Sequence, residues 1–470
     1  LLLLLCLPPF AAIALNTTSF KSYTSEYLLD TPQLQARPSL VGANWLTWTP
    51  VSGASGYELE VSNTGLPATF VKHSSFGPSV RSYRHTGLYY SQKVYYRLKA
   101  LGTGNDFSYS AVVSATTNPA GKVYRIMPLG DSNTEGGRGD AETNLKVSYR
   151  ARLAQLLDGT VSRGKYDFVG SQRSGASLTT DIDHAGFGGA TIQNISDLLR
   201  NRSYGGTTNS QGLTYLQEYQ PDVILLHIGT NDADGSDAAI TRLEGLLNEI
   251  DKYEASSGKD VTVILAKIIK RVCYNDVFVY SYNCYTPKEA EATLIYNSKM
   301  ATMAQNRRAN GDNLLLVDMQ DGAGIIYKWA SDGGDMSDPL HPTQPGYDKM
   351  APVWFAELDK LLNVQPVSPP DTEAPETTIL TKPAALTNST SATFSFGSNE
   401  SNVVYLASID GGAFAEVPNP YTITGLTDGS HTIEVKAKDA AGNIDESPAT
   451  YTWTVDTQAP AAPVVLNPAE

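Results

Sequence analysis

Apolar and polar side chains alternate in short runs between residues 37 and 117. Tyr57, Leu59 and Val61 are separated by glutamates, and the run KVYYRLKAL repeats this alternation. Glycine, serine and asparagine, which favour turns, separate the runs. A period of two with frequent turns predicts antiparallel strands, so we expect residues 37–117 to form an all-β sandwich domain.

The pattern changes at residue 122, where nearly continuous apolar runs alternate with segments of helical periodicity. The expected strands are residues 123–129, 166–170, 223–228, 261–269 and 314–317. The expected helices are SYRARLAQLL, AAITRLEGLLNEIDKY, PKEAEATLIYNSKMATMAQNRR and PGYDKMAPVWFAELDKLL. Continuous apolar strands are typical of a parallel sheet with helices on both faces. Residues 122–363 therefore predict an α/β domain with a three-layer, flavodoxin-like fold.

Beyond this domain, the proline-rich residues 364–375 predict an extended linker. Alternation returns in residues 376–457, which contain the hairpin sequence IDGG. DTEAP at Asp371 recurs as DTQAP at Asp456, which indicates a tandem repeat whose next copy begins within residues 458–470. The chain is thus expected to be multidomain, with a central α/β domain between two all-β sandwich domains.

Residues 1–14, LLLLLCLPPFAAIA, have the apolar core of a secretory signal peptide and a small-x-small cleavage site at its end. A buried strand is the alternative, but five consecutive leucines suit translocation better. The run is too short to span a bilayer, and no later run reaches about 18 apolar residues. We expect a secreted protein, free or associated with the cell surface, without a membrane span.

Secretion would leave two cysteines in the mature chain, Cys273 and Cys284. In an oxidising compartment we expect a disulfide between them, which would stabilise by roughly 2–3 kcal/mol; two free thiols are the alternative. No CxxC pair or Cys/His cluster indicates zinc. The formal net charge of −14 comes without any run of lysines and arginines, which argues against nucleic acid as a partner.

Two polar motifs begin where expected strands end. GDS, which ends at Ser132, follows VYRIMPL, and GTND, which contains Asn231, follows VILLHI. Open α/β sheets bind ligands at the carboxyl ends of their strands. Gly130 permits a sharp turn that leaves the Ser132 hydroxyl at this edge; the alternative is that Asp-Ser caps a helix. Asn231 and a backbone N–H at Gly189, in HAGFGGATI, can stabilise a carbonyl oxygen that gains charge, whereas a flexible loop is the alternative for these glycines.

A serine nucleophile needs a base, and histidine accepts and returns protons near neutrality. Three histidines fall in the α/β domain. His227 lies within an apolar run and is expected in the core, and His184 lies in a glycine-rich loop. His341 follows Asp338 by three residues, a spacing that lets the carboxylate hold one imidazole nitrogen while the other faces Ser132. A solvated loop histidine is the alternative.

These motifs, in this order, resemble those of the SGNH (GDSL-type) hydrolases over the whole α/β domain. The resemblance implies that Ser132 is the nucleophile, that His341 is the base, and that Asp338 orients the base. It also implies an oxyanion hole made of the Ser132 N–H, Gly189 and Asn231. Such a reaction proceeds through an acyl-enzyme and requires no cofactor and no metal.

Within that superfamily, RIMPLGDS, YDFVGS, PDVILLHIGTND and HPTQPGYDKMA are most similar to carbohydrate esterase family 3, whose known members deacetylate xylan. Asn133 replaces that family's common isoleucine and Ala190 its common bulky aromatic residue, and both departures bear on the acyl pocket and the sugar contacts. The acidic loop from Asp332 to Asp335 has the composition of a calcium site, but we favour a solvated charged turn.

The β domains carry resemblances of their own. WLTWTPVSGASGYELEV together with KVYYRLKAL resembles a fibronectin type III domain, in which Trp48 would be the core tryptophan. Trp45 points to the opposite face, either as a platform for a sugar or, as we favour, as a partly covered edge residue. DGGAF and GLTDGSHTIEVKAKDAAGN resemble the Ig-like repeats of large bacterial surface and secreted proteins.

Together these features predict a secreted, modular serine esterase that removes small acyl groups, acetyl above all, from a polysaccharide such as acetylated xylan. Two alternatives remain open. One is the same hydrolase acting on lipids or other non-carbohydrate esters, and the other is an inactive cell-surface adhesin. The β domains would act as spacers or as weak modules for adhesion to glycans or to the cell surface.

Overall fold

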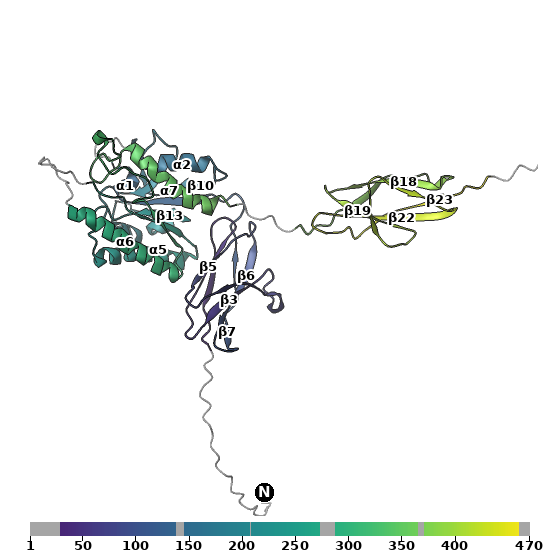
Figure 1. Ribbon diagram of the computed structural model, residues 1–470, viewed down its shortest axis with the longest axis horizontal. Helices are drawn as coiled ribbons and strands as arrows, with labels where there is room; N and C mark the ends of the chain where they lie inside the picture. Colours follow the sequence, from purple (N-terminus) through teal and green to yellow (C-terminus); the bar gives the residue numbers. More distant parts are fainter. Residues whose placement is uncertain (1–28, 138–144, 207, 273–286, 365–370, 460–470) are drawn as a thin grey trace, which may run out of the picture. The chain divides into compact units, whose positions relative to one another are not determined.

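The computed structural model describes residues 29–137, 145–206, 208–272, 287–364 and 371–459. The described residues before the gap at 365 form one compact unit, and those after it form a second. The first unit holds an N-terminal β region and the central α/β domain, and the second is entirely β (Figure 1). The predicted order of a β-rich, an α/β and a second β-rich region is therefore present.

A seven-stranded sheet forms the centre of the α/β domain. Its strands lie in the order β11-β12-β9-β13-β14-β15, with β10 also paired to β9. Their bounds are Tyr124–Gly130 (β9), Tyr166–Phe168 (β10), Gln172–Arg173 (β11), Asp183–Gly186 (β12), Val223–His227 (β13), Thr262–Lys267 (β14) and Leu314–Asp318 (β15). Every pairing is parallel except that of β11 with β12. The five expected strands are β10-β9-β13-β14-β15, which is the strand order of flavodoxin-like sheets.

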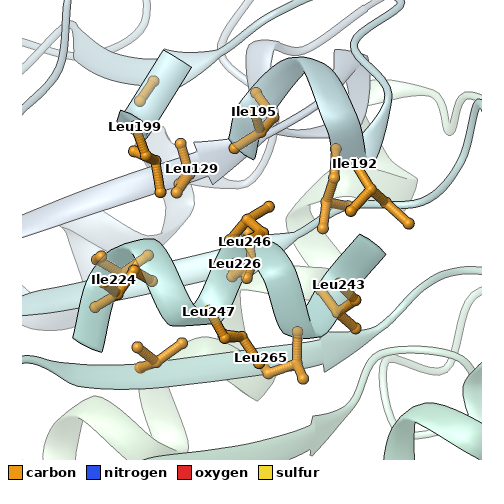
Figure 2. Packing of buried hydrophobic residues seen from close by; sticks show 14 of the residues in the cluster. Leu129, Ile192, Ile195, Leu199, Ile224, Leu226, Leu243, Leu246, Leu247 and Leu265 are labelled. Carbon is orange, nitrogen blue, oxygen red and sulfur yellow. The ribbon is translucent and has the colours of Figure 1, made fainter. Parts of the chain in front are cut away.

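Helices lie on both faces of this sheet. Their bounds are Ser132–Glu135 (α1), Arg150–Asp158 (α2), Ile192–Asn201 (α3), Tyr215–Tyr219 (α4), Asp237–Ser257 (α5), Pro287–Ala309 (α6) and Gln344–Leu362 (α7). Alternate residues of β13 face two different hydrophobic clusters. Ile224 and Leu226 pack with α3, α5 and α6, whereas Val223 and Leu225 pack with α2 and α7. Figure 2 shows the first cluster, with leucines of α5 packed against the strands.

The N-terminal β region consists of two antiparallel sheets, β1-β2-β5 and β4-β3-β6-β7, with β8 paired to β6. The strand bounds are Leu34–Pro38 (β1), Asn44–Trp48 (β2), Gly56–Ser62 (β3), Val71–Phe76 (β4), Ser82–His85 (β5), Lys93–Leu101 (β6), Phe107–Tyr109 (β7) and Val113–Thr116 (β8). Trp48 and Tyr57 are buried in its core. Leu40 and Val41, in the turn between β1 and β2, belong instead to the α/β cluster that contains α2 and α7.

A buried polar network also joins this region to the α/β domain. Ser39 Oγ donates to the Asp260 carboxylate (2.7 Å), and Asn313 Nδ2 donates to the same group (2.9 Å). Arg84 donates to Ser39 Oγ (3.0 Å) and to Asn313 Oδ1 (2.9 Å). A buried carboxylate is costly unless it is hydrogen-bonded, so this network stabilises the docked arrangement of the two regions.

The second unit has two sheets, β16-β18-β21 and β17-β23-β22-β19-β20. Their bounds are Thr377–Thr381 (β16), Leu386–Thr387 (β17), Ser391–Ser398 (β18), Val404–Ile409 (β19), Ala415–Val417 (β20), Tyr421–Thr424 (β21), Gly429–Lys438 (β22) and Ala449–Val455 (β23). Phe394 and Trp453, whose rings lie 5.2 Å apart, are at the centre of its core. All residues of this hydrophobic cluster come from the unit itself.

Several predictions fall outside the described residues. These are the signal peptide at residues 1–14, the pair Cys273 and Cys284, and nearly all of the expected further repeat at residues 458–470. In the part of the chain that the structure describes, no helix combines the length and the apolar character that a membrane crossing requires.

Candidate active site

The turn between β9 and α1 presents Ser132. Gly130 has φ = 158°, and a Cβ atom there would lie only 2.0 Å from the carbonyl oxygen of His227, so a side chain does not fit. Asp131 caps α1 by accepting a hydrogen bond from the Asn133 N–H (3.0 Å). Both interpretations of the GDS sequence therefore apply at once, because its aspartate caps the helix while its serine faces the edge of the sheet.

Ser132, His341 and Asp338 form a continuous chain of hydrogen bonds. Ser132 Oγ lies 2.8 Å from His341 Nε2, and His341 Nδ1 lies 2.7 Å from Asp338 Oδ2. The N–H groups of Leu340 and His341 donate to Asp338 Oδ1, each at 2.8 Å. Although burial opposes ionisation, these hydrogen bonds, with that of His341 the strongest, hold the pKa of Asp338 below its usual value. An ionised carboxylate keeps the proton on Nδ1, which leaves Nε2 free to accept from the serine.

Asp131 supports the turn that carries Ser132. It is fully buried and accepts a hydrogen bond from the Thr230 N–H (3.2 Å), while His227 Nδ1 lies 3.9 Å from its carboxylate. Although burial opposes ionisation, the nearby His227 and the contacts with Thr230 and Asn133 hold the pKa of Asp131 below its usual value. His227 itself is fully buried and accepts from the Ile269 N–H (3.4 Å). The prediction that His227 is a core residue is confirmed.

Asn231 and Asp232 fix the loop that carries Gly189 beside the end of β13. Asn231 Nδ2 donates to the carbonyl oxygen of Ala190 (2.9 Å), and the Asp232 carboxylate accepts from the Ile192 N–H (3.1 Å). Gly189 is exposed and has φ = 73°, a conformation that favours glycine. The structure therefore brings this loop and the GTND segment together at the carboxyl edge of the sheet.

The donors of the predicted oxyanion hole are available for a ligand. Among the hydrogen bonds of the described residues, none uses the N–H of Ser132 or that of Gly189. The Asn231 amide uses one of its two hydrogens on the Ala190 carbonyl, and its side chain is exposed. The role of these three groups stays a prediction, and their arrangement is compatible with it.

The two departures from the family pattern lie inside the domain. Asn133 is fully buried, where its Nδ2 donates to Thr230 Oγ1 (3.3 Å) and its Oδ1 accepts from the Tyr347 hydroxyl (3.1 Å). Ala190 is also fully buried and packs in the cluster of α3 and α5. Both positions thus serve internal packing and hydrogen bonding, and neither side chain faces solvent beside Ser132.

Arg150 and His184 form a buried polar cluster with Ser174 in the same domain, and the sequence assigned neither of them a role. Arg150 is fully buried and donates to the carbonyl oxygen of Lys146 (3.0 Å) and to Ser174 Oγ (3.0 Å), and burial lowers the pKa of its guanidinium to about 10. His184 lies on β12, not in a loop as expected, and its ring lies 2.8 Å from Ser174 Oγ. Arg150 begins a helix that carries a second arginine, Arg152, two residues later, and nothing in the sequence indicates which of the two is buried.

The acidic loop after Trp329 differs from the expected solvated turn. Asp332 is exposed, but Asp335 is buried and forms an ion pair with Lys349 (2.6 Å). Within the described ranges, neither aspartate belongs to a group of acidic, histidine or cysteine side chains with the spacing of metal ligands. One such group, with oxygens within 4.8 Å of one another, occurs in the second unit and consists of Asp371, Glu400 and Asp439.

Comparison with known proteins identifies two regions of the chain. Residues 126–354 match the family model described as GDSL-like Lipase/Acylhydrolase, and residues 369–457 match that of the bacterial Ig-like domain. The chain is 27% identical over 274 residues to a multidomain esterase of Ruminococcus flavefaciens. This match covers 57% of the chain but only 33% of the relative, so the chain spans about a third of that protein's length.

Two solved structures are similar to the central domain. A family 3 carbohydrate esterase from Clostridium thermocellum is 30% identical, and the match covers 51% of this chain and 98% of that one, with a TM-score of 0.36. A family 3 carbohydrate esterase from Talaromyces cellulolyticus is 21% identical, and the match covers 51% and 99% of the two chains, with a TM-score of 0.37.

Proposed function

This chain belongs, through residues 126–354, to the GDSL-like lipase/acylhydrolase family, and we propose that it removes small acyl groups, acetyl above all, from a polysaccharide. The observation that carries this proposal is the hydrogen-bond chain from Asp338 through His341 to Ser132. The similarity of its motifs to carbohydrate esterase family 3 supports the substrate class, with acetylated xylan as its first example.

In the proposed mechanism, Ser132 Oγ attacks the ester carbonyl carbon while His341 Nε2 accepts the hydroxyl proton. His341 then returns this proton to the departing sugar oxygen, which leaves an acyl group on the serine. Water attacks the acyl-enzyme with His341 again as the base, and the acid is released. Asp338 stays ionised throughout, in keeping with its lowered pKa, and stabilises the imidazolium that forms in each step.

The negative charge on the attacked oxygen would be stabilised by the Ser132 N–H, the Gly189 N–H and the second hydrogen of the Asn231 amide. Fixed donors are worth more than mobile ones, because they need no reorganisation during the reaction. The hydrogen bond from the Asn231 amide to the Ala190 carbonyl and that from the Ile192 N–H, at the start of α3, to the Asp232 carboxylate hold Asn231 and the Gly189 loop in place and so support this assignment.

We propose a three-layer α/β fold for the central domain, supported by the two hydrophobic clusters on opposite faces of β13. We also propose that the N-terminal β region is a fibronectin type III domain and that the enzyme acts outside the cell, where a polymeric substrate is accessible.

Acetate release from acetylated xylan by the full chain tests the function. Ser132→Ala should lower the rate by about 10⁴- to 10⁶-fold, because the acyl-enzyme cannot form. Ser177→Ala, which removes an exposed serine of the same domain, is the matched control and should keep full activity. Equal rates for the two variants, with both folded by circular dichroism, would refute the assignment.

The same assay separates the alternatives. An acetylated xylan, an acetylated mannan and a short-chain triglyceride should be compared at equal ester concentration. Faster cleavage of the triglyceride would indicate a lipid esterase, and no cleavage of any ester by the wild-type chain would favour an inactive adhesin.

A further inference from the structure

A cavity of about 420 Å³ lies between the N-terminal β region and the α/β domain. Its wall includes Asp260, two residues before β14, and Asn313, directly before β15. These strands run parallel to β13, and β13 runs parallel to β9, whose carboxyl end presents Ser132. The cavity therefore lies at the opposite edge of the sheet from the serine, roughly 20 Å away for strands of this length.

Trp45, on β2, lines this cavity and lies outside the hydrophobic clusters of the first unit. The alternation along β2 buries Leu46 and Trp48 and leaves Trp45 half-buried on the other face. Among the described residues, it belongs neither to the core of the N-terminal region nor to either cluster of the α/β domain, and it pairs with no aromatic ring. A large indole is thus placed among polar groups, where it contributes little to a hydrophobic core.

The one cation over the Trp45 ring among the described residues belongs to a neighbouring cavity. The guanidinium of Arg84 lies 5.4 Å from the ring centre. Arg84 lines a second cavity of about 500 Å³, which shares Trp45 with the first, but Arg84 does not line the first cavity. The part of the indole that lines the first cavity is therefore not occupied by this cation.

The groups around Trp45 in this cavity both donate and accept hydrogen bonds. Gln35, Thr47 and Asn310 contribute amides and a hydroxyl. Charged side chains of the wall have partners within the protein: Arg307 pairs with Asp251 (2.6 Å) and Asp312 (2.5 Å), and the Asp260 carboxylate accepts from Ser39 and Asn313. An aromatic ring bordered by groups that donate and accept hydrogen bonds is complementary to a sugar ring with an apolar face and hydroxyl groups at its edge.

We infer that the cavity beside Trp45 binds a short segment of a neutral glycan, with one sugar ring stacked on the indole. The choice of glycan rests on the proposed function. Because Ser132 lies at the opposite edge of the sheet, a polysaccharide held at Trp45 leaves the catalytic edge open to other chains or to a distant part of the same chain. The site would therefore increase the time that the enzyme spends on its polymer without contacting the ester that is cleaved. The expectation that Trp45 is partly covered is confirmed, because its side chain is half-buried, and the inferred sugar contact adds a role to it.

Binding to the full chain that carries Ser132→Ala tests this inference without hydrolysis. Xylohexaose, cellohexaose and mannohexaose are titrated calorimetrically into this protein and into versions that also carry Trp45→Ala or Trp45→Phe. Trp45→Ala should weaken binding of at least one of these glycans by about tenfold or more, as for other aromatic anchors, and Trp45→Phe by less. Gln305→Ala, at a residue that lines only the second cavity, is the matched control and should change nothing.

A second measurement separates this site from the active site. With Ser132 intact, Trp45→Ala should leave kcat/KM on p-nitrophenyl acetate within twofold and should lower the rate on insoluble acetylated polysaccharide several-fold. The inference would be overturned if none of the three glycans binds, or if neither Trp45 variant changes their binding. Neither result affects the proposed function, which depends on the loss of ester cleavage in Ser132→Ala.

Discussion

The two β-rich regions of this chain are both two-sheet sandwiches, but they differ in where their apolar side chains are buried. The C-terminal unit keeps its hydrophobic cluster within itself, around Phe394 and Trp453. The N-terminal region has such a core as well, but it also contributes Leu40 and Val41 to the α/β domain. The C-terminal sandwich therefore buries its apolar side chains on its own, whereas the N-terminal sandwich buries all of its own only when it is docked on the α/β domain.

Polar groups show the same difference. The N-terminal region supplies Ser39 and Arg84 to the buried Asp260 of the α/β domain, through direct and Asn313-mediated hydrogen bonds. Such a network is stable only if every member keeps its partner. A β domain beside a catalytic domain therefore need not be a spacer, and here the N-terminal β region contributes side chains to the core of the α/β domain.

Removal of each β region in turn gives the largest expected effect. A chain that begins at Lys122 exposes the surface covered by Leu40 and Val41, which should destabilise the α/β domain by about 3–6 kcal/mol. A chain that ends at Val364 should retain the stability of the first unit within about 0.5 kcal/mol. Urea unfolding monitored by tryptophan fluorescence measures both. Equal stability of the two truncated chains would contradict the comparison.

The sequence predicted the elements of this fold well where periodicity was strong. All five expected strands and all four expected helices of the α/β domain are present within a few residues of their predicted ends. Strands β11 and β12 and helix α4 were not anticipated, because they have only two to five residues and β12 lies in the glycine-rich HAGFGG segment. Helix α3, with 10 residues, was also not anticipated, although it is longer than the anticipated α2. The docking of the N-terminal region was not predictable either, since its apolar turn residues follow no period.

The candidate site shows a similar limit. Strand ends and the DxxH spacing identified Ser132, Asn231 and His341 as neighbours, because parallel strands bring their carboxyl ends to one edge. The contacts of the supporting groups were not identified, since Arg150 is hydrogen-bonded to Ser174 and Asp131 to Thr230, far along the chain in both cases. Long-range contacts of this kind leave no local pattern in a single sequence.

A smaller change, Arg84→Ala, tests only the buried hydrogen-bond network that joins the N-terminal β region to the α/β domain; we call this contact the junction. Loss of the guanidinium removes a cation near the buried Asp260 carboxylate. Breaking such a buried network typically lowers the free energy of unfolding by about 3 kcal/mol. Lys436→Ala is the control in the C-terminal unit, where the ammonium lies over the Phe414 ring (5.3 Å), and it should cost less than about 1 kcal/mol. Denaturant midpoints of the two variants provide the measurement. A loss at Lys436 as large as that at Arg84 would remove the distinction between a docked and an independent domain.

The smallest expected effect is on the pH dependence of stability, and it arises from Glu254, beside the junction. Burial, with the nearby Asp260 as a second cause, raises the pKa of Glu254 to about 8. The pKa of an unfolded glutamate is about 4.3. Between this pH and pH 8, Glu254 therefore keeps a proton in the folded chain that it releases in the unfolded chain. Stability should therefore fall as the pH rises through this window and level off above it. Glu254→Gln keeps an oxygen for the Val261 N–H (2.6 Å) and removes the ionisation.

Relative to the wild type, Glu254→Gln should gain roughly 2 kcal/mol in unfolding free energy on going from pH 5 to pH 8.5, after a discount for the part of the side chain that solvent reaches. The same gain should appear in the chain that ends at Val364, because Glu254 and the groups that shift its pKa all lie in the first unit. Urea titrations at the two pH values measure it. A gain that disappears in the shortened chain would mean that the C-terminal unit takes part in the junction, and the contrast between the two β regions would then fail.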